Sequence, residues 1–98
     1  MKTIFKYGLT PDDEVHIAMP QGAVILSCQT QGDFPVIWAL VDPERPGVTR
    51  RFYVCPTGAP VPPRVASDLQ ATDGPRFLST IQLAGGALVF HIFYDPER

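Results

Sequence analysis

The sequence has few of the residues that build a disulfide framework or a metal site. Its 98 residues include two cysteines, Cys28 and Cys55, and two histidines, His16 and His91. No HxH, HxxxH or CxxC spacing occurs, so a metal site would need ligands gathered from distant strands. Without a secretion signal, two cysteines are expected to remain free thiols. We therefore expect no metal, no cofactor and no disulfide.

Membrane-length apolar runs and an excess of one charge are also missing. No run approaches the roughly 20 apolar residues that span a bilayer, and Met1 to Leu9 lacks the apolar core of a signal peptide. Ten acidic residues stand against eight basic ones, for a formal net charge of -2. This balance disfavours a basic surface for duplex nucleic acid. We expect a cytoplasmic protein with no membrane partner and no duplex nucleic-acid partner.

Charged residues are scarce relative to apolar ones. Hydrophobic residues make up 45% of the chain and charged residues 18%. A chain of this size forms a single domain, residues 1–98, with one core. Little polar surface is then left to cover its outside. Homo-oligomerisation through an apolar face or a sheet edge is therefore an expectation.

Apolar residues are densest between Phe34 and Val41. From Val36 onward the residues of both parities are apolar, which is typical of an interior strand covered on both faces. Asp42-Pro43 then ends the run and prevents its continuation as a helix. This segment is predicted to be the central strand.

Alternating apolar and polar residues, interrupted by turn signals, predict six further strands. They span residues 2–7, 14–19, 23–31, 49–55, 77–83 and 88–94. Short connections between residues 14 and 42 predict an antiparallel meander, with the opening strand beside it. Residues 56–76 hold five of the eleven prolines, and at most one short helix is expected there, near Val65 to Ala71. The predicted fold is all-β, a small antiparallel β-sandwich or partly open barrel of about seven strands.

The last two strands form a hairpin around Gly85-Gly86, which favours a tight two-residue turn. Centring the turn there predicts a register that collects seven large apolar residues and one serine on a single face. The predicted pairs are Leu83 with Leu88, Ile81 with Phe90, Ser79 with Ile92 and Phe77 with Tyr94.

Arginine forms the most distinctive polar cluster. Five of the eight basic residues fall between residues 45 and 76. If the loops meet, Arg45, Arg50, Arg51 and Arg64 would offer guanidinium groups to an anion. The alternative is that they are separate, solvated arginines. We predict these four as ligand-binding residues.

No residue is assigned a catalytic role. Asp12, Asp13 and Glu14 are adjacent in a turn, where consecutive side chains diverge. A nucleophilic thiol would need Cys28 or Cys55 beside a histidine that a third group orients. Cys28 lies in an apolar strand, which is more typical of a core residue.

Several short segments, spread over nearly the whole chain, carry a family resemblance. They are Met1 to Tyr7, Met19-Pro20, Gly22-Ala23, Trp38 to Asp42, Arg51-Phe52, Thr57-Gly58 and Gly86 to His91. With them the chain resembles a family of small uncharacterised proteins encoded by bacteriophages and prophages. Many members have Gly-Thr-Gly where this chain has Cys55 to Gly58, which argues against a family role for the Cys55 thiol. The resemblance implies a phage setting, inside the bacterial host, and an unknown function.

Three functions follow as hypotheses. The first is a non-catalytic phage accessory protein that blocks a host protein or sequesters a small anionic ligand, by analogy with other short phage proteins. The second is a structural or assembly role in the virion, through exposed sheet edges. The third is a small hydrolase or transferase, for which the sequence offers no site signature.

Overall fold

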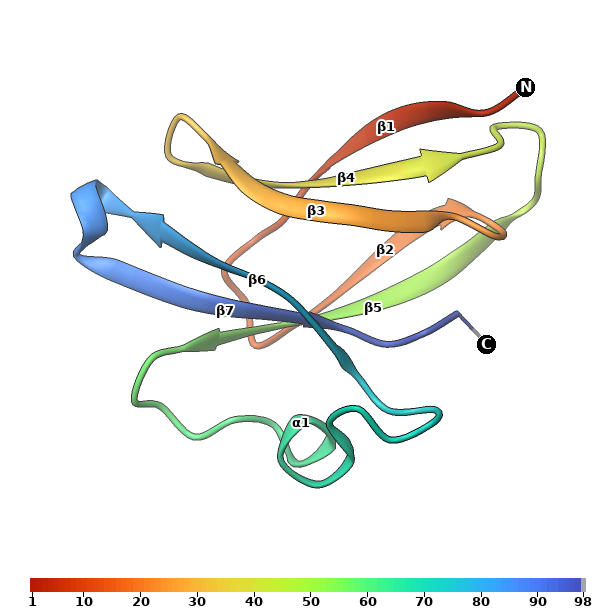
Figure 1. Cartoon of the computed structure of the whole chain (residues 1–98). Coiled ribbons are helices and arrows are strands. Elements are labelled where there is room, and N and C mark those ends of the chain that lie inside the picture. The colour runs from red at the N-terminus through yellow and green to blue at the C-terminus, as the bar shows by residue number, and fades with distance from the viewer. Residues whose placement is uncertain (98) are drawn as a thin grey trace.

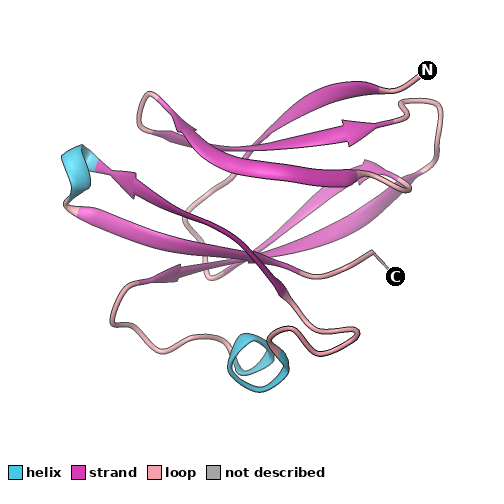
Figure 2. Ribbon diagram, in the orientation of Figure 1, coloured by secondary structure: helices cyan, strands magenta, loops and turns pink. Residues whose placement is uncertain are grey.

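The protein is a two-layer β-sandwich with one short helix (Figures 1 and 2). The computed structural model describes residues 1–97. Its elements are β1 (Thr3–Gly8), β2 (Glu14–Pro20), β3 (Val24–Gln31), β4 (Phe34–Val41), β5 (Gly47–Pro56), α1 (Pro63–Asp68), β6 (Arg76–Leu83), a 3-10 turn η1 (Ala84–Gly86) and β7 (Leu88–Tyr94). The molecule measures 40 × 33 × 16 Å. Its short dimension holds the two stacked sheets, so each sheet has one inner face and one outer face. The predicted all-β sandwich is confirmed.

The strands divide into two antiparallel sheets. Sheet A has the order β1-β4-β3, and sheet B has the order β2-β5-β7-β6. The predicted meander over residues 14–42 is therefore wrong in part. Of its three strands, β3 and β4 form a hairpin as predicted, but β2 pairs with β5 of the other sheet. The turn after β2 contains Gly22 at a φ of +83°, a conformation that favours glycine, and it carries the chain from one sheet to the other. Two strands joined by a short turn need not pair if the turn crosses between layers.

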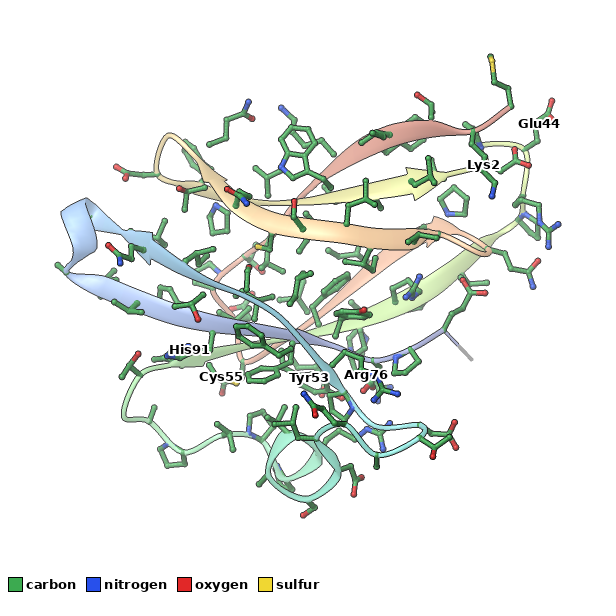
Figure 3. The ribbon with its side chains drawn as sticks, viewed as in Figure 1. Lys2, Glu44, Tyr53, Cys55, Arg76 and His91 are labelled. Atoms are coloured by element: carbon green, nitrogen blue, oxygen red, sulfur yellow. The ribbon has the colours of Figure 1, made fainter. Side chains whose placement is uncertain are left out.

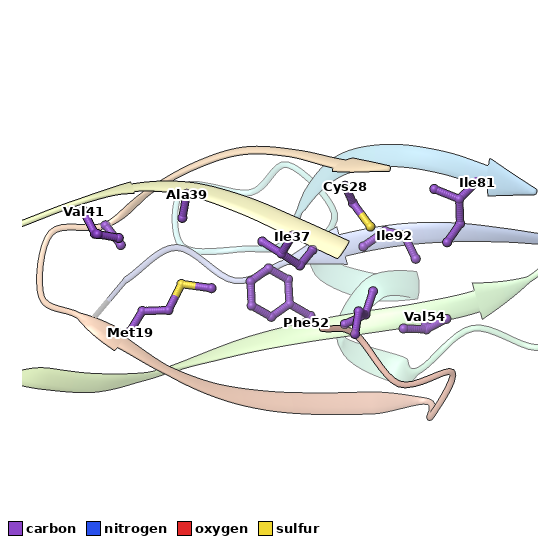
Figure 4. Packing of buried hydrophobic residues seen from close by; sticks show 11 residues of the cluster. Met19, Cys28, Ile37, Ala39, Val41, Phe52, Val54, Ile81 and Ile92 are labelled. Atoms are coloured by element: carbon purple, nitrogen blue, oxygen red, sulfur yellow. The ribbon is translucent and has the colours of Figure 1, made fainter. Parts of the chain in front are cut away.

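β4 is the central strand of sheet A, as predicted, but only one of its faces is covered. Ile37, Ala39 and Val41 point towards sheet B and are at most 1% exposed (Figure 4). Trp38 and Leu40 lie on the opposite face and are partly exposed. The expectation of two covered faces was wrong because residues 1–97 supply no third layer over sheet A.

The core fills the space between the sheets. Sheet A contributes Ile37 and Cys28, and sheet B contributes Phe52 and Ile92, each no more than 1% exposed (Figure 4). Met19, at the end of β2, closes the same cluster. Burial of these side chains is the main source of the sandwich's stability.

Two β-bulges shift the strand registers. In β3 the shift lies between Ile25 and Ser27, so Ile25 and Cys28 both contribute to the core although they are three residues apart. In β6 the shift lies between Phe77 and Ser79.

The bulge in β6 changes one end of the predicted hairpin. The pairs nearest the turn are confirmed, from Leu83 with Leu88 to Ser79 with Ile92. Beyond the bulge Phe77 pairs with Phe93 instead of Tyr94, because one residue of β6 has no partner. The predicted two-residue turn was also wrong. The connection begins with Ala84 at a φ of 51° and makes a 3-10 turn through Gly85 and Gly86.

The segment from residue 57 to 75 covers part of the outer face of sheet B, over Tyr53, Cys55 and Phe93 (Figure 1). It contains α1, which begins and ends slightly earlier than the helix predicted near Val65 to Ala71. Val65 is buried against Tyr53 and Cys55 of β5. Among residues 1–97 no helix has the length and apolarity to cross a membrane.

Candidate functional site

Two of the four predicted arginines converge on the buried carboxylate of Asp95. Arg64 Nε donates to Asp95 Oδ1 at 3.3 Å, and Arg51 Nη1 lies 3.7 Å from Asp95 Oδ2. The Tyr53 hydroxyl, which points from sheet B towards α1 (Figure 3), donates to the same Oδ2 at 2.9 Å. Burial and this hydrogen bond raise the pKa of Tyr53, so its hydroxyl remains the donor.

Both arginines also have second acidic partners. Arg64 Nη1 donates to Asp68 Oδ2 at 3.1 Å, and its Nη2 donates to the carbonyl of Asp73. Arg51 Nε lies 3.6 Å from Glu14 Oε2. Arg64 links the segment over sheet B to Asp95, whereas Arg51 joins Asp95 to Glu14 of β2, and carboxylates of the same chain already neutralise both guanidinium groups.

The other two predicted arginines lie on either side of the turn between β2 and β3. Arg50 faces the space between the sheets, is 5% exposed, and donates from Nη1 to the carbonyl of Ala23 at 2.8 Å. Its Nη1 also lies 3.8 Å from Glu97 Oε1. Arg45, in the exposed loop before β5, donates to Gln21 Oε1 at 2.9 Å. The structure thus divides the predicted cluster into two pairs instead of one cationic surface.

The histidine and cysteine side chains form no nucleophilic arrangement of the kind considered above. His91 lies opposite Cys55 in the β5–β7 register, but its ring nitrogens contact the hydroxyls of Thr57 at 2.7 Å and Thr80 at 2.9 Å. Both cysteines are free, as predicted. Burial raises the pKa of Cys28 to about 11 and also raises that of Cys55, which disfavours the reactive thiolate at neutral pH. Within residues 1–97 no three His, Cys, Asp or Glu side chains are grouped to hold a metal ion.

Sequence reasoning missed the outer face of sheet A. We call it the apolar face, and define it by the outward-facing apolar side chains of β1, β3 and β4. They are Ile4, Val24, Leu26, Phe34, Trp38 and Leu40, whereas Val36 of the same parity is only 5% exposed. Four of them are large and well exposed, from 47% for Leu26 to 75% for Phe34. Exposed apolar side chains gathered on one face mark interaction surfaces more often than isolated ones do.

The same face contains almost no charge. The three strands of sheet A carry one charged residue, Lys6. Its Nζ donates to Gln31 Oε1 at 2.9 Å and lies 5.9 Å from the centroid of the Trp38 ring, so the lysine bridges the sheet above the tryptophan. The near absence of charge in these three segments was visible in the sequence. The sequence did not show which face of these strands would be left uncovered.

These features define a small antiparallel β-sandwich with one uncovered apolar face. The chain belongs to the family described as domain of unknown function DUF7352, whose model matches residues 1–98. No curated protein and no solved structure matches the chain. Membership of an uncharacterised family agrees with the resemblance described above.

Proposed function

We propose that this protein is a non-catalytic binding protein that covers a surface of another protein with its apolar face. The observation that carries the proposal is that sheet A holds a single charged residue while Phe34 is 75% exposed and Ile4 57% exposed. Charge depletion combined with aromatic side chains characterises the buried centre of protein interfaces. In the phage setting implied by the resemblance, the partner would be a host protein that this chain blocks.

The chemistry of the face specifies the partner. Lys6 lies among apolar side chains, and its hydrogen-bond partner is the neutral Gln31. Burial of an ammonium group without a counter-ion is costly, so the partner should place a carboxylate opposite Lys6 within an otherwise apolar surface. A second copy of sheet A would not supply that carboxylate, because its strands contain no acidic residue.

The other hypotheses have weaker support. Capture of an anion by all four predicted arginines is disfavoured, since Arg51 and Arg64 already contact Asp95. Assembly in a virion would use the apolar face, or the edge strands β1 and β3, between copies of this chain. The oligomeric state of the purified protein separates that role from binding to a different protein.

The test uses glutamate substitutions on exposed positions, which leave the core unchanged. Phe34→Glu and Leu26→Glu place a carboxylate on the apolar face. Leu88→Glu is the matched control, because Leu88 is 50% exposed, close to the 47% of Leu26, but belongs to sheet B. Each variant is used to capture proteins from a bacterial host lysate, and hydrogen exchange is measured on the resulting complex.

The expected result is a partner retained by the wild type and by Leu88→Glu but lost with both variants of the apolar face. Hydrogen exchange should slow in β1, β3 and β4 when the partner is bound. A partner that binds all variants equally would overturn the assignment of the face. A wild-type dimer that both substitutions on the apolar face dissociate would replace the proposal with self-assembly.

A further inference from the structure

Arg50 is unusual because it is an inward-facing arginine in a β-sandwich. It shares the inner side of β5 with Phe52 and Val54, and it is 5% exposed. Arginine is rarely buried to this degree unless its charge is paired. Desolvation lowers the pKa of Arg50, which is the direction expected of a cation removed from water. Its location therefore requires a compensating anion.

The compensation that the chain itself provides is incomplete. Arg50 Nη1 donates to the carbonyl of Ala23, but Nε is buried and has no hydrogen-bond partner among the described residues. Among the described residues, the carboxylate that pairs with Arg50 is that of Glu97, whose Oε1 lies 3.8 Å from Arg50 Nη1 and accepts the backbone N–H of Gly22 at 2.7 Å. A buried, unpaired guanidinium nitrogen marks a place where one more acceptor is expected.

A hollow of about 140 Å³ adjoins this arginine. It is lined by two stretches of backbone and side chain, residues 48–51 of β5 and residues 95–97 after β7. One of its acids, Asp95, is already engaged by Tyr53 and Arg64. Glu97 is therefore the acid of the hollow that serves Arg50, and its side chain is 26% exposed.

We infer that Arg50 and the backbone N–H of Gly22 form an anion-binding cradle, in which the carboxylate of Glu97 occupies the place of an external carboxylate or phosphate group. Glu97 follows the last strand, and among the described residues its carboxylate contacts the N–H of Gly22 and the guanidinium group of Arg50, so an incoming anion displaces it without disturbing either sheet. The guanidinium group then offers the ligand a planar set of donors, and Gly22 offers the N–H that Glu97 releases. This cradle lies beside the β2–β3 turn and does not depend on the proposed function of the apolar face.

Titration of the full chain with inorganic phosphate, followed by amide NMR, tests the inference. The amide of Gly22 should shift saturably, and Glu97→Ala should tighten phosphate binding about tenfold by removing an intramolecular competitor. Acetate is titrated in parallel to distinguish a carboxylate from a phosphate ligand, and sodium chloride at equal ionic strength controls for screening. Arg76→Gln, which removes an arginine whose guanidinium group donates to the carbonyls of residues 71, 72 and 74, away from Gly22, should leave the affinity unchanged.

Saturation by phosphate, by acetate or by both, enhanced in Glu97→Ala, supports the cradle and identifies its ligand chemistry. A Gly22 response that chloride reproduces would overturn it. So would equal affinities of the wild type and Glu97→Ala, because the carboxylate would then not occupy the site. These outcomes do not require an Arg50 variant, which would risk unfolding the domain.

Discussion

Three buried ionisable side chains show how differently this small domain treats charge. The carboxylate of Asp95 lies beside two arginines and accepts a hydrogen bond from a tyrosine hydroxyl, so its burial is compensated. Arg50 is compensated in part, with one nitrogen left unpaired. Cys28 remains a neutral thiol in the core between the sheets, so no charge is buried there. At the residue scale, the incompletely paired group is the one that indicates a ligand.

The thiol of Cys28 makes stability depend on pH in the alkaline range. Burial raises the pKa of Cys28 from 9.0 to about 11, so between these values the unfolded thiol ionises while the folded thiol does not. The stabilisation is fully present below pH 9 and is lost as the pH rises towards 11. We expect the free energy of unfolding, measured by urea denaturation, to fall over this window and to fall less steeply in Cys28→Ala. Parallel curves for the two proteins would contradict the assignment, since Tyr7, Tyr53 and Cys55 also titrate late and contribute equally to both.

At the scale of elements, the segment over sheet B depends on polar anchoring more than on its own helix. α1 has six residues and no side-chain cap at its N-terminus, and isolated helices of that length are not stable. Val65 is its single buried residue. The helix is therefore held in place by the contact of Arg64 with Asp95 and by the packing of Val65 on Tyr53, while the pair of Arg64 with Asp68 lies within the helix itself.

Asp95→Asn should loosen this segment selectively. The substitution removes the charge that Arg64 and Arg51 share, and we expect a loss of about 1–3 kcal/mol. Limited proteolysis should then cut faster between residues 57 and 75, while amides of β3 and β4 keep their protection. Asp73→Asn is the matched control, because Arg64 contacts only the backbone carbonyl of that residue. Equal cleavage rates in both variants would show that the Asp95 carboxylate does not anchor the segment.

At the scale of the whole molecule, local patterns were predictable and the assignment of strands to layers was not. Periodicity and turn residues located all seven strands, because these signals act over a few neighbouring residues. The partner of β2 depends on whether the turn at Gly22 stays within a sheet or crosses between sheets, which its sequence does not state. The bulges at Leu26 and Leu78 were also missed, since each is visible only against a partner strand.

For the candidate sites too, the sequence showed which residues are neighbours along the chain but not which layer each side chain faces. Clustering along the chain suggested one arginine site, but alternation along β5 sends Arg50 inward and Arg51 outward, so neighbours in sequence belong to different sites. The apolar face required knowledge of which side of β4 meets sheet B. The separation of Arg50 from Arg51 and the exposure of the apolar face both arise from the stacking of two sheets and not from any single strand.

A sandwich with one core predicts which aromatic residue matters most for stability. Trp38 is the single tryptophan and lies in the most apolar strand, yet it is on the outer face of sheet A and is partly exposed. Phe52 is 0% exposed between the sheets. We expect Phe52→Ala to cost about 3–5 kcal/mol of unfolding free energy and Trp38→Ala roughly half of that or less. Chemical denaturation followed by circular dichroism measures both values without relying on tryptophan fluorescence. If Trp38→Ala proved the more costly substitution, the outer face of β4 would have to be covered in solution, and binding of this face to a different protein would lose its basis.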